Sequence, residues 1–312
     1  MIDVQPAEPG SEAAGRQALS ALYHDFFTGL ILTIASNDGA DAAGDWAFSL
    51  FRRQHLEKFL SSFDKLGLTG LPDAVAAARY HYLSNQIGGV TVEYVAESDR
   101  KAWVRFPHPR WIYMGPAICG VPESVGQGYV RGWYGHNGVS LGNPRLGFVC
   151  TSQDTHAHEG FAGYFLEYDR DLAPDERAVF TTGETMPPFD PAAAPVLDAA
   201  VWTAERLGKA RRNYAMEYVR NGLTELIQLA GPEHAAALGG RTARLVGRQA
   251  YPELCHILGL DPADAGLAAF GRFMQAMAQA HGDTLDWTVD AGGLTLDQDG
   301  WRLVRGMDDV SP

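Results

Sequence analysis

The sequence predicts an α+β protein in which three helices followed by a β-hairpin occur twice along the chain. Apolar residues recur at helical spacing over long segments, whereas shorter segments alternate apolar and polar residues as strands do. The 312 residues are 46% hydrophobic and 20% charged, which is ordinary for one large domain or two smaller ones. The first copy is expected to continue into further strands that hold the functional site.

The first copy contains three expected helices and one hairpin. Helical spacing of apolar residues occurs in "RQALSALYHDFFTGLILTIASN" at 16–37 and in "WAFSLFRRQHLEKFLSSFDKLGL" at 46–68. A third helix is expected over "LPDAVAAARYHYLSNQI", where Pro72 suits the first turn and Gly88 with Gly89 forms a stop. The segments "VTVEYVAE" and "KAWVRF", joined by the polar turn "SDR", then alternate as a hairpin does.

A stretch at 107–172 follows the hairpin. Its glycines and aromatic residues are compatible with a loop, a closely packed helix around 123–138 and an apolar strand that ends at Cys150. The segment "GFAGYFLEYDRDL" alternates well enough to be another strand. Residues 173–196 are rich in proline and are expected to form a linker.

The second half is interpreted as an internal duplication, because 197–306 repeats the order helix, helix, helix, strand, turn, strand. Three aligned pairs support it: Gly29-Leu30 with Gly222-Leu223, Arg53-Gln54 with Arg248-Gln249, and Gly67-Leu68 with Gly259-Leu260. The alternative is that any two three-helix segments can be aligned by eye. The predicted domains are a disordered tail at 1–14, a first α+β domain at 15–172, the linker at 173–196 and a truncated repeat at 197–306.

The second copy has no counterpart to 107–172. This unrepeated stretch is therefore the expected place of the functional site, with the second copy as a scaffold or a pocket wall.

The acidic balance of the chain argues against two classes of partner. A formal net charge of −13 and a pI near 5.1 do not suit a surface for nucleic acid or anionic lipid. The N-terminal "MIDVQPAEPGSEAAG" lacks the basic and apolar regions of a signal peptide, and "FFTGLILTIA" is too short to span a bilayer. The expectation is a cytoplasmic protein that binds neither nucleic acid nor membrane.

Common sequence signatures of disulfide, zinc and nucleotide sites are missing. Cys119, Cys150 and Cys255 have no Cys-x-x-Cys spacing, so reduced thiols are expected rather than a disulfide framework or a structural zinc site. The glycine-rich segment "GPAICGVPESVGQG" follows neither phosphate-loop nor dinucleotide-binding spacing. No Gly-x-Ser-x-Gly nucleophile elbow occurs either.

The segment "CTSQDTHAHEG" contains the residues best suited to chemistry. In one continuous strand, Cys150, Asp154, His156 and His158 would share a face. Cys150 and His156 would then lie roughly 20 Å apart, so a Cys-His dyad requires a turn near "SQD". The alternative for Cys150 is a small core residue at the end of a buried strand.

The two histidines of this segment need no turn to act together. His156 and His158, with Asp154 or Glu159, could hold a divalent transition metal such as Zn, Mn or Fe. The alternative is that both imidazoles are exposed or hydrogen-bonded and have no ligand role.

Aromatic and basic residues nearby suit a small-molecule pocket. The segments "RGWYGHNG" and "FPHPRWIY" supply candidate substrate-binding residues, namely Arg131, Trp133, Tyr134, His136 and His108. An equally good interpretation is that these aromatics fill the interface between the two copies. His24, His55 and His81 are expected on helix surfaces or at an interface, although His81 could face the pocket.

The order of elements over 16–172 resembles the L-2-amino-thiazoline-4-carboxylate hydrolase-like family, which is related in architecture to the vinyl-reductase-type small-molecule-binding domain. The likeness rests on the helices, on the hairpin "VTVEYVAESDRKAWVRF" and on "LGNPRLGFVCTSQD" followed by "FAGYFLEYDRDL". The family often has a further cysteine after the last strand, where this chain reads "DLAPDERAVF". The resemblance implies ring-opening hydrolysis of a cyclic amidine or a related C–N bond, with Cys150 and Asp154 at the family's positions.

The leading hypothesis is a small-molecule hydrolase that acts on a C–N bond of a cyclic or amidine-like metabolite. Cys150 would be nucleophile or ligand, Asp154 would orient or act as base, and His156 with His158 would transfer protons or hold a metal that activates water. Two alternatives stay open: a non-catalytic small-molecule-binding sensor domain, and a metal-dependent lyase or oxygenase centred on the two histidines. The expected partner is a small-molecule substrate, and a homodimer is left open.

Overall fold

The computed structural model of the chain describes residues 8–107, 115–156 and 160–307. It is 58% helical and 15% strand, which confirms the α+β class. The chain divides into a first unit, Ile31–Leu207, and a second unit made of residues 8–30 and 208–307. These divisions fall inside two long helices, α1 (Glu12–Asp38) and α7 (Ala204–Ala230), whereas the expected boundaries lay at the linker.

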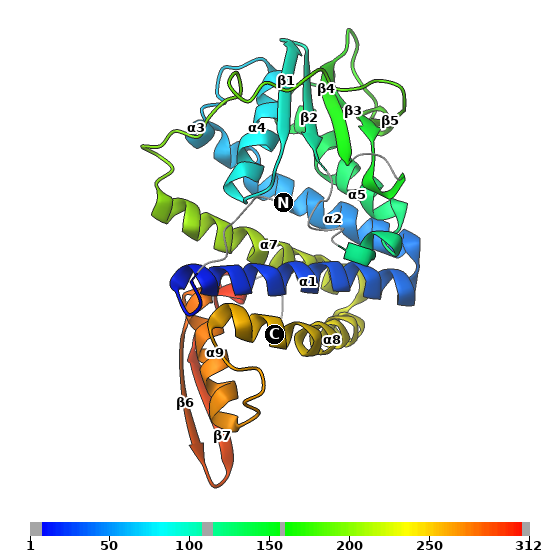
Figure 1. The fold of residues 1–312 in the computed structure, drawn as a ribbon. Coiled ribbons are helices and arrows are strands. Elements are labelled where there is room, and N and C mark those ends of the chain that lie inside the picture. Colours follow the sequence, from blue (N-terminus) through cyan, green and yellow to red (C-terminus); the bar gives the residue numbers. More distant parts are fainter. Residues whose placement is uncertain (1–7, 108–114, 157–159, 308–312) are drawn as a thin grey trace. The chain divides into compact units, whose positions relative to one another are not determined.

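The first unit contains a five-stranded sheet in the order β1-β2-β4-β3-β5 (Figure 1). All pairings are antiparallel except that of β3 with β5, which is parallel. The strands are β1 (Glu93–Ser98), β2 (Lys101–Phe106), β3 (Leu146–Ser152), β4 (Phe161–Glu167) and β5 (Ala178–Phe180). The expected hairpin and the strand through Cys150 are present, and β5 lies in the segment expected to be a linker.

The Pro-rich segment is packed against one face of the sheet. Trp103, Tyr164 and Val149 form a row across β2, β4 and β3, and Met186 packs against this row. Glu184 accepts hydrogen bonds from Tyr164 Oη at 2.7 Å and from Lys101 Nζ at 2.9 Å. A few anchoring side chains among prolines produce no periodicity, which is why composition alone indicates a linker here.

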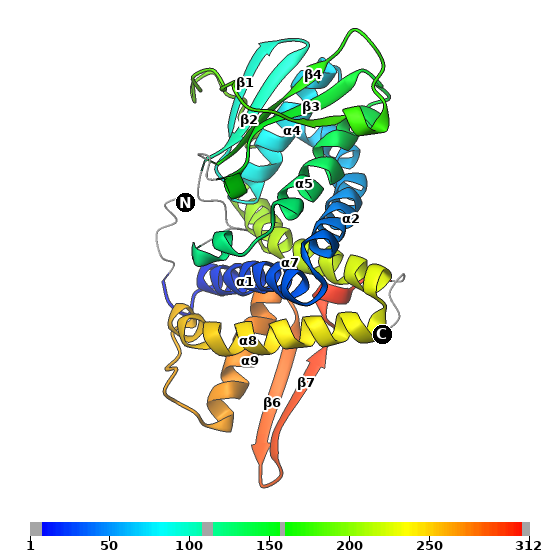
Figure 2. The ribbon, with the colours of Figure 1, turned by 90° about the vertical axis from the view of Figure 1, so that its right-hand side faces the viewer.

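On the opposite face, α4 (Asp73–Ile87) packs against the sheet and α5 (Glu123–Gly132) contacts β4 through Tyr129 and Phe161. Helix α2 (Ala40–Lys58) packs against α5 (Figure 2). Phe148 and Phe165 are paired across β3 and β4, one residue along from the row on the other face, so their side chains point toward the helices. His81 of α4 stacks on Phe165 with ring centroids 5.5 Å apart, and Tyr134 lies 4.4 Å from Phe148.

Helices α2 and α5 approach each other closely at glycines. A Cβ atom added to Gly132 would lie 2.5 Å from Phe48 O, and Gly128 likewise faces the backbone of α2. Because the two main chains are this close, Arg52 of α2 reaches the end of α5. Its Nε donates to Gly132 O at 2.9 Å and its Nη2 donates to Arg131 O at 3.2 Å. A cation is favoured there, since helix C-termini expose carbonyl oxygens.

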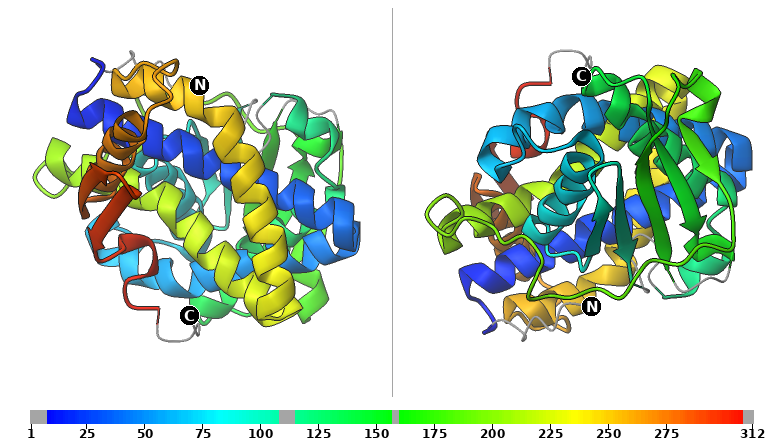
Figure 3. Two further views of the ribbon diagram at one scale, coloured as in Figure 1. Left: turned by 90° about the horizontal axis from the view of Figure 1, so that it is seen from below. Right: turned by 90° about the horizontal axis from the view of Figure 1, so that it is seen from above.

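The second unit is built from the first part of α1, three further helices and a separate two-stranded sheet (Figure 3). Its core joins Tyr23 of α1, Met216 of α7, Leu254 of α8 and Phe273 of α9. The further elements are α8 (Pro232–Leu258), α9 (Leu267–His281), β6 (Thr284–Asp290) and β7 (Gly293–Asp299).

Helix α1 extends beyond the apolar segment noted in the sequence. Its 27 residues are long and apolar enough to cross a membrane by length and composition. Helices in the core of globular proteins pass the same test, and Leu19, Tyr23 and Phe27 of α1 are buried.

The element order agrees with the expected duplication, and the hairpins differ. Three long helices and a hairpin follow one another in each half, α1, α2, α4, β1, β2 in the first and α7, α8, α9, β6, β7 in the second. The first half also has the four-residue helix α3 (Phe63–Leu66) between α2 and α4. The first hairpin belongs to a larger sheet, whereas the second forms a sheet by itself. The duplication therefore stays a prediction.

Candidate functional site

Cys150 lies inside the sheet of the first unit. It is 1% exposed, on β3, with Gly163 of β4 and Phe180 of β5 as its neighbours across the strands. Its thiol donates to Ser152 O at 3.5 Å. These contacts are those of a core residue at a strand end, one of the two interpretations of this cysteine.

Residues 150–156 do not form one continuous strand, because β3 ends at Ser152. The chain turns there, as "SQD" permits, into the short 3₁₀ helix η5 (Asp154–His156), and Asp154 is 5% exposed. His156 ends this turn, where its Nε2 lies 2.9 Å from Glu123 Oε2 and Gln153 Nε2 donates to its Nδ1 at 3.1 Å. The hydrogen bond from His156 lowers the pKa of Glu123.

The predicted metal ligands are only partly within the described chain. His158 and Glu159 fall outside the described residues, and so does His108. Over 8–107, 115–156 and 160–307, no group of three or more His, Cys, Asp or Glu side chains is arranged to hold a metal ion. The metal site stays a prediction.

Thiol labelling separates the two interpretations of Cys150. In the folded protein only Cys119 is expected to react rapidly, because it is exposed while Cys150 and Cys255 are each 1% exposed. A time course with a chromogenic disulfide reagent measures this, and Cys119→Ser should remove the fast phase. A fast phase that survives in Cys119→Ser and disappears in Cys150→Ser would instead reveal the reactive thiol that a nucleophile requires.

The other predicted residues lie at the far end of α5. Arg131 is in its last turn, Trp133 follows it, and Tyr134 and His136 form the 3₁₀ helix η4 (Tyr134–His136). His156 contacts Glu123 at the first residue of the same helix. Since a ten-residue helix is about 15 Å long, the predicted site divides into two groups. Arg131 is exposed, and its guanidinium lies over the Phe180 ring, 5.5 Å from the centroid.

Two histidines meet at this end of α5. The ring of His55, on α2, lies 5.2 Å from that of His136 and 6.0 Å from that of Trp133, measured between centroids. His55 is fully buried, and its Nε2 lies 2.8 Å from Ser140 Oγ at the end of α6 (Asn137–Ser140). His55 was expected on a helix surface or at an interface. It lies instead in the core of the first unit.

Two arginines add positive charge around these imidazoles. Arg52 and Arg177 are close enough for Arg177 to lower the pKa of Arg52, after the effect of burial. Burial, then His136 and Arg52, lower the pKa of His55 to about 3. Burial, then Arg52 and Arg177, lower that of His136 to about 4. Arg52, His55, His136, Ser140 and Arg177 are called the cationic cluster below.

Both imidazoles of the cationic cluster are therefore neutral at pH 7, and the two guanidiniums hold its charge. In the described parts of the chain, neither Arg52 nor Arg177 forms an ion pair with a carboxylate. Like charges held together without a counter-charge favour a bound anion.

Aromatic rings and buried polar groups form the wall behind the cluster. His81 stacks on Tyr134 with centroids 4.0 Å apart, and Asn137 Nδ2 lies 3.1 Å from His81 Nε2. Burial, then the nearby His55, lower the pKa of His81 well below its usual value. His81 is thus a neutral core residue that fixes Asn137 and Tyr134 rather than a proton donor.

Sequence reasoning missed Arg52, His55, Ser140 and Arg177. A signal for His55 was present, because it lies four residues after Phe51 and eight after Ala47 on the buried stripe of α2. Arg177 could not have been found in this way, since it precedes a three-residue strand in a Pro-rich segment. Comparisons of the chain with family models, with curated proteins and with solved structures return no match.

Proposed function

We propose that the first unit binds a small metabolite through its carboxylate at the cationic cluster. The observation that supports this most is the presence of Arg52 and Arg177 beside two neutral histidines, with no carboxylate partner in the described residues. A guanidinium presents a planar fork of donors that matches a carboxylate. Such a site suits the non-catalytic small-molecule-binding sensor domain, which is one of the two alternatives considered from the sequence.

Buried polar atoms around the cluster support the same proposal. Trp133 Nε1, Asn137 Oδ1, Arg177 Nε and His55 Nδ1 are buried and hydrogen-bond to none of the described protein groups. Buried polar atoms are nearly always paired, so several unpaired ones in one region favour a polar ligand or ordered water there. Trp133 and Arg177 offer donors, and Asn137 offers an acceptor to a hydroxyl or amino group on the same ligand.

The protonation state of the cluster favours binding over proton transfer. A general base works best when its pKa is near the working pH, and that of His55 is lowered to about 3. The 2.8 Å contact of His55 with Ser140 is therefore a hydrogen bond between neutral groups, not an activated nucleophile. Hydrolysis of a C–N bond at Cys150 and Asp154 stays a prediction from the resemblance.

Calorimetric titration with acetate, succinate and proline tests the proposal. Saturable binding of at least one carboxylate is expected, and Arg177→Gln should weaken it by about 10- to 100-fold, the usual value of a hydrogen bond to a charged group. Arg53→Gln is the matched control, since Arg53 lies on the same helix as Arg52 and pairs with Glu57 at 3.9 Å. Equal affinities for wild type and Arg177→Gln, or no binding at all, would contradict the proposal.

The pH dependence of the same titration is a second readout. A bound anion favours protonated imidazole, so it raises the pKa values of His55 and His136 from about 3 and about 4. The complex then binds protons that the free protein does not, and affinity increases as the pH falls through the raised pKa values. Titrations in buffers of different ionisation enthalpy measure this proton uptake.

We also propose that residues 15–172 and 197–306 arose by internal duplication. Gly67 ends α3 (Phe63–Leu66) and Gly259 ends α8, both with left-handed φ values of 66° and 72°. The following amides, of Leu68 and Leu260, donate to carbonyls at 3.0 and 2.8 Å in the same Schellman arrangement. Two glycines that align in the sequence and end their helices with the same geometry support a common origin of the two copies. An alignment of the first copy with the second across homologous sequences would test this origin.

A further inference from the structure

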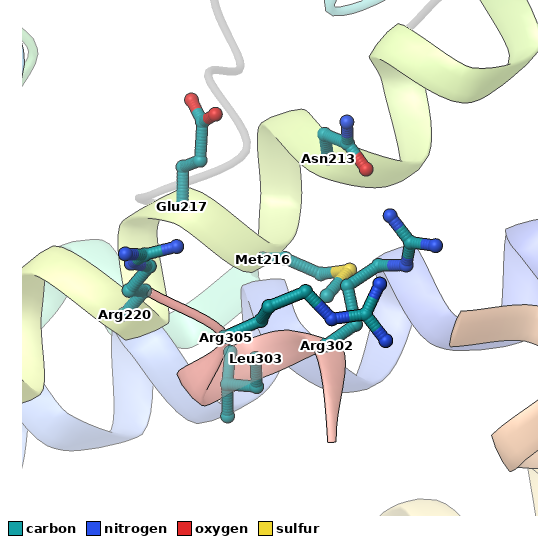
Figure 4. A pocket seen from close by; sticks show the side chains of 7 residues that line it. All are labelled: Asn213, Met216, Glu217, Arg220, Arg302, Leu303 and Arg305. Carbon is teal, nitrogen blue, oxygen red and sulfur yellow. The ribbon is translucent and has the colours of Figure 1, made fainter. Parts of the chain in front are cut away.

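The second unit contains a small pocket lined by three arginines. Its volume is about 170 Å³, and it lies between α7 and the 3₁₀ helix η7 (Arg302–Val304) that follows β7. The lining residues are Asn213, Met216, Glu217, Arg220, Arg302, Leu303 and Arg305 (Figure 4). This arginine pocket is independent of the cationic cluster, since all of its residues belong to the second unit.

The arginines that line the pocket come from two segments, Arg220 from α7 and Arg302 with Arg305 from η7 and the residue after it. The side chains of Arg302 and Arg305 extend toward the same side, whereas Glu217 points away from them (Figure 4). Arg220 Nη2 donates to Gly306 O at 3.1 Å, which joins α7 to the segment after η7. Met216 and Leu303, each 5% exposed, form an apolar floor.

The positive charge of the pocket is only partly balanced by protein groups. Asp283 Oδ2 accepts from the backbone amide of Arg302 at 2.9 Å, and its Oδ1 lies 3.7 Å from Arg305 Nη2. Arg302 Nε is buried and hydrogen-bonds to none of the described protein groups. Burial, followed by the nearby Arg302 and Arg16, lowers the pKa of Arg212, so a further guanidinium lies next to the pocket. The chain as a whole has a net charge of −13, which makes this local excess of arginine more notable.

Size and donor chemistry together limit the ligand. Pockets for drug-sized molecules occupy roughly 300 Å³ or more, so a volume of about 170 Å³ suits a single oxyanion group. Arginine recognises phosphate through parallel N–H donors, and a dianion gains more than a monocarboxylate from several guanidiniums. No histidine is among the residues that line the pocket, and a guanidinium is a permanent donor with no acceptor site.

We propose that the arginine pocket binds a phosphate group, either of inorganic phosphate or of a small phosphomonoester. Arg302 and Arg305, which extend toward the same side, clamp the phosphate oxygens, Arg220 of α7 adds positive charge, and Asn213 of the same lining can contact an ester substituent.

Titration of the full chain with inorganic phosphate at constant ionic strength, followed by ³¹P NMR and calorimetry, tests this inference. One saturable site is expected, and Arg305→Gln should weaken it by about tenfold or more. The matched control is Arg244→Gln, an exposed arginine of α8 outside the pocket, which should bind as wild type does. Arg305→Lys keeps the charge and loses the fork, so an intermediate affinity is expected.

Glycerol 3-phosphate in a parallel titration distinguishes the two sources. Tighter binding than inorganic phosphate would identify a phosphomonoester, and equal or weaker binding would identify the free ion. Circular dichroism of each variant shows whether it is folded. If Arg305→Gln does not fold, the affinity of Arg305→Lys is compared with that of wild type instead. No saturable binding of either probe at millimolar concentration, or equal affinity in wild type and Arg305→Gln, would overturn the inference.

Discussion

Gly132→Ala is expected to lower the free energy of unfolding by about 1–3 kcal/mol, the usual cost of an added group in a packed interior. The added Cβ would lie 2.5 Å from Phe48 O, so α2 and α5 must move apart. Arg52 would then lose its bonds to the carbonyls of Gly132 and Arg131, at 2.9 and 3.2 Å. Urea unfolding followed by circular dichroism measures the loss, and carboxylate binding should weaken with it.

Gly247→Ala is the matched control for this substitution. Gly247 lies inside α8, and nothing is within 4 Å of a Cβ added there. Alanine at such a position usually stabilises a helix by about 0.4–1 kcal/mol. Unchanged unfolding of Gly132→Ala would mean that the two helices are not in close contact at this glycine.

His55→Phe is expected to make the protein less sensitive to acid. The pKa of His55 is lowered from an ordinary value near 6.5 to about 3 in the folded chain. Well above pH 6.5 the imidazole is neutral in both the folded and the unfolded chain, and it has no effect on the pH dependence of stability. Below it, the unfolded chain binds a proton that the folded chain does not, so stability falls by about 1.4 kcal/mol per pH unit until the pH nears the folded value.

The measurement compares wild type with His55→Phe in urea at pH 7 and pH 5. Between pH 6.5 and 5 wild type should lose about 2 kcal/mol more than the variant. At pH 7 the variant should be less stable by about 1 kcal/mol, the value of its lost hydrogen bond to Ser140. His256→Phe, on the exposed surface of α8, is the control and should keep the acid sensitivity of wild type. Parallel curves for wild type and His55→Phe would show that His55 is not buried as a neutral group.

The two proposed anion sites should respond differently to solution conditions. The cationic cluster contains His55 and His136, whose protonation would accompany binding, so its affinity depends on pH. The arginine pocket holds guanidiniums that stay charged, so its affinity follows the ionisation of the phosphate and the ionic strength. The two sites can therefore be separated in one protein by varying pH and salt independently.

The fold was largely accessible from the sequence where periodicity is strong. The helical spacing of "WAFSLFRRQHLEKFL" and the alternation of "KAWVRF" correspond to α2 and β2. Strand β5 was not accessible, because three residues in a Pro-rich segment have no period and pair in parallel with a strand far along the chain. The division into two units could not be predicted from the sequence either, because it falls inside the continuous helices α1 and α7, where no change of composition marks a boundary.

The candidate site was accessible only in part. The aromatic and histidine content of "RGWYGHNG" pointed to His136, which belongs to the cationic cluster, and to Trp133, which lies beside it. The pairing of His136 with His55 depends on the glycine contact between α2 and α5, a long-range event that no local pattern encodes. The segment "CTSQDTHAHEG" was more conspicuous, yet its His156 contacts Glu123, at the opposite end of α5.

Strand β5 determines when the cationic cluster is complete. Arg177 directly precedes it, and the strand is held at the sheet edge by Phe148 N donating to Arg177 O and Thr181 N donating to Cys150 O, each at 2.9 Å. Short edge segments open at a lower free energy than central strands. The apparent affinity of the cationic cluster for an anion is therefore its intrinsic affinity multiplied by the fraction of molecules in which β5 is paired with β3. A change that weakens the pairing of these three residues would lower the fraction of clusters with a bound anion, even if no residue of the cluster itself is altered.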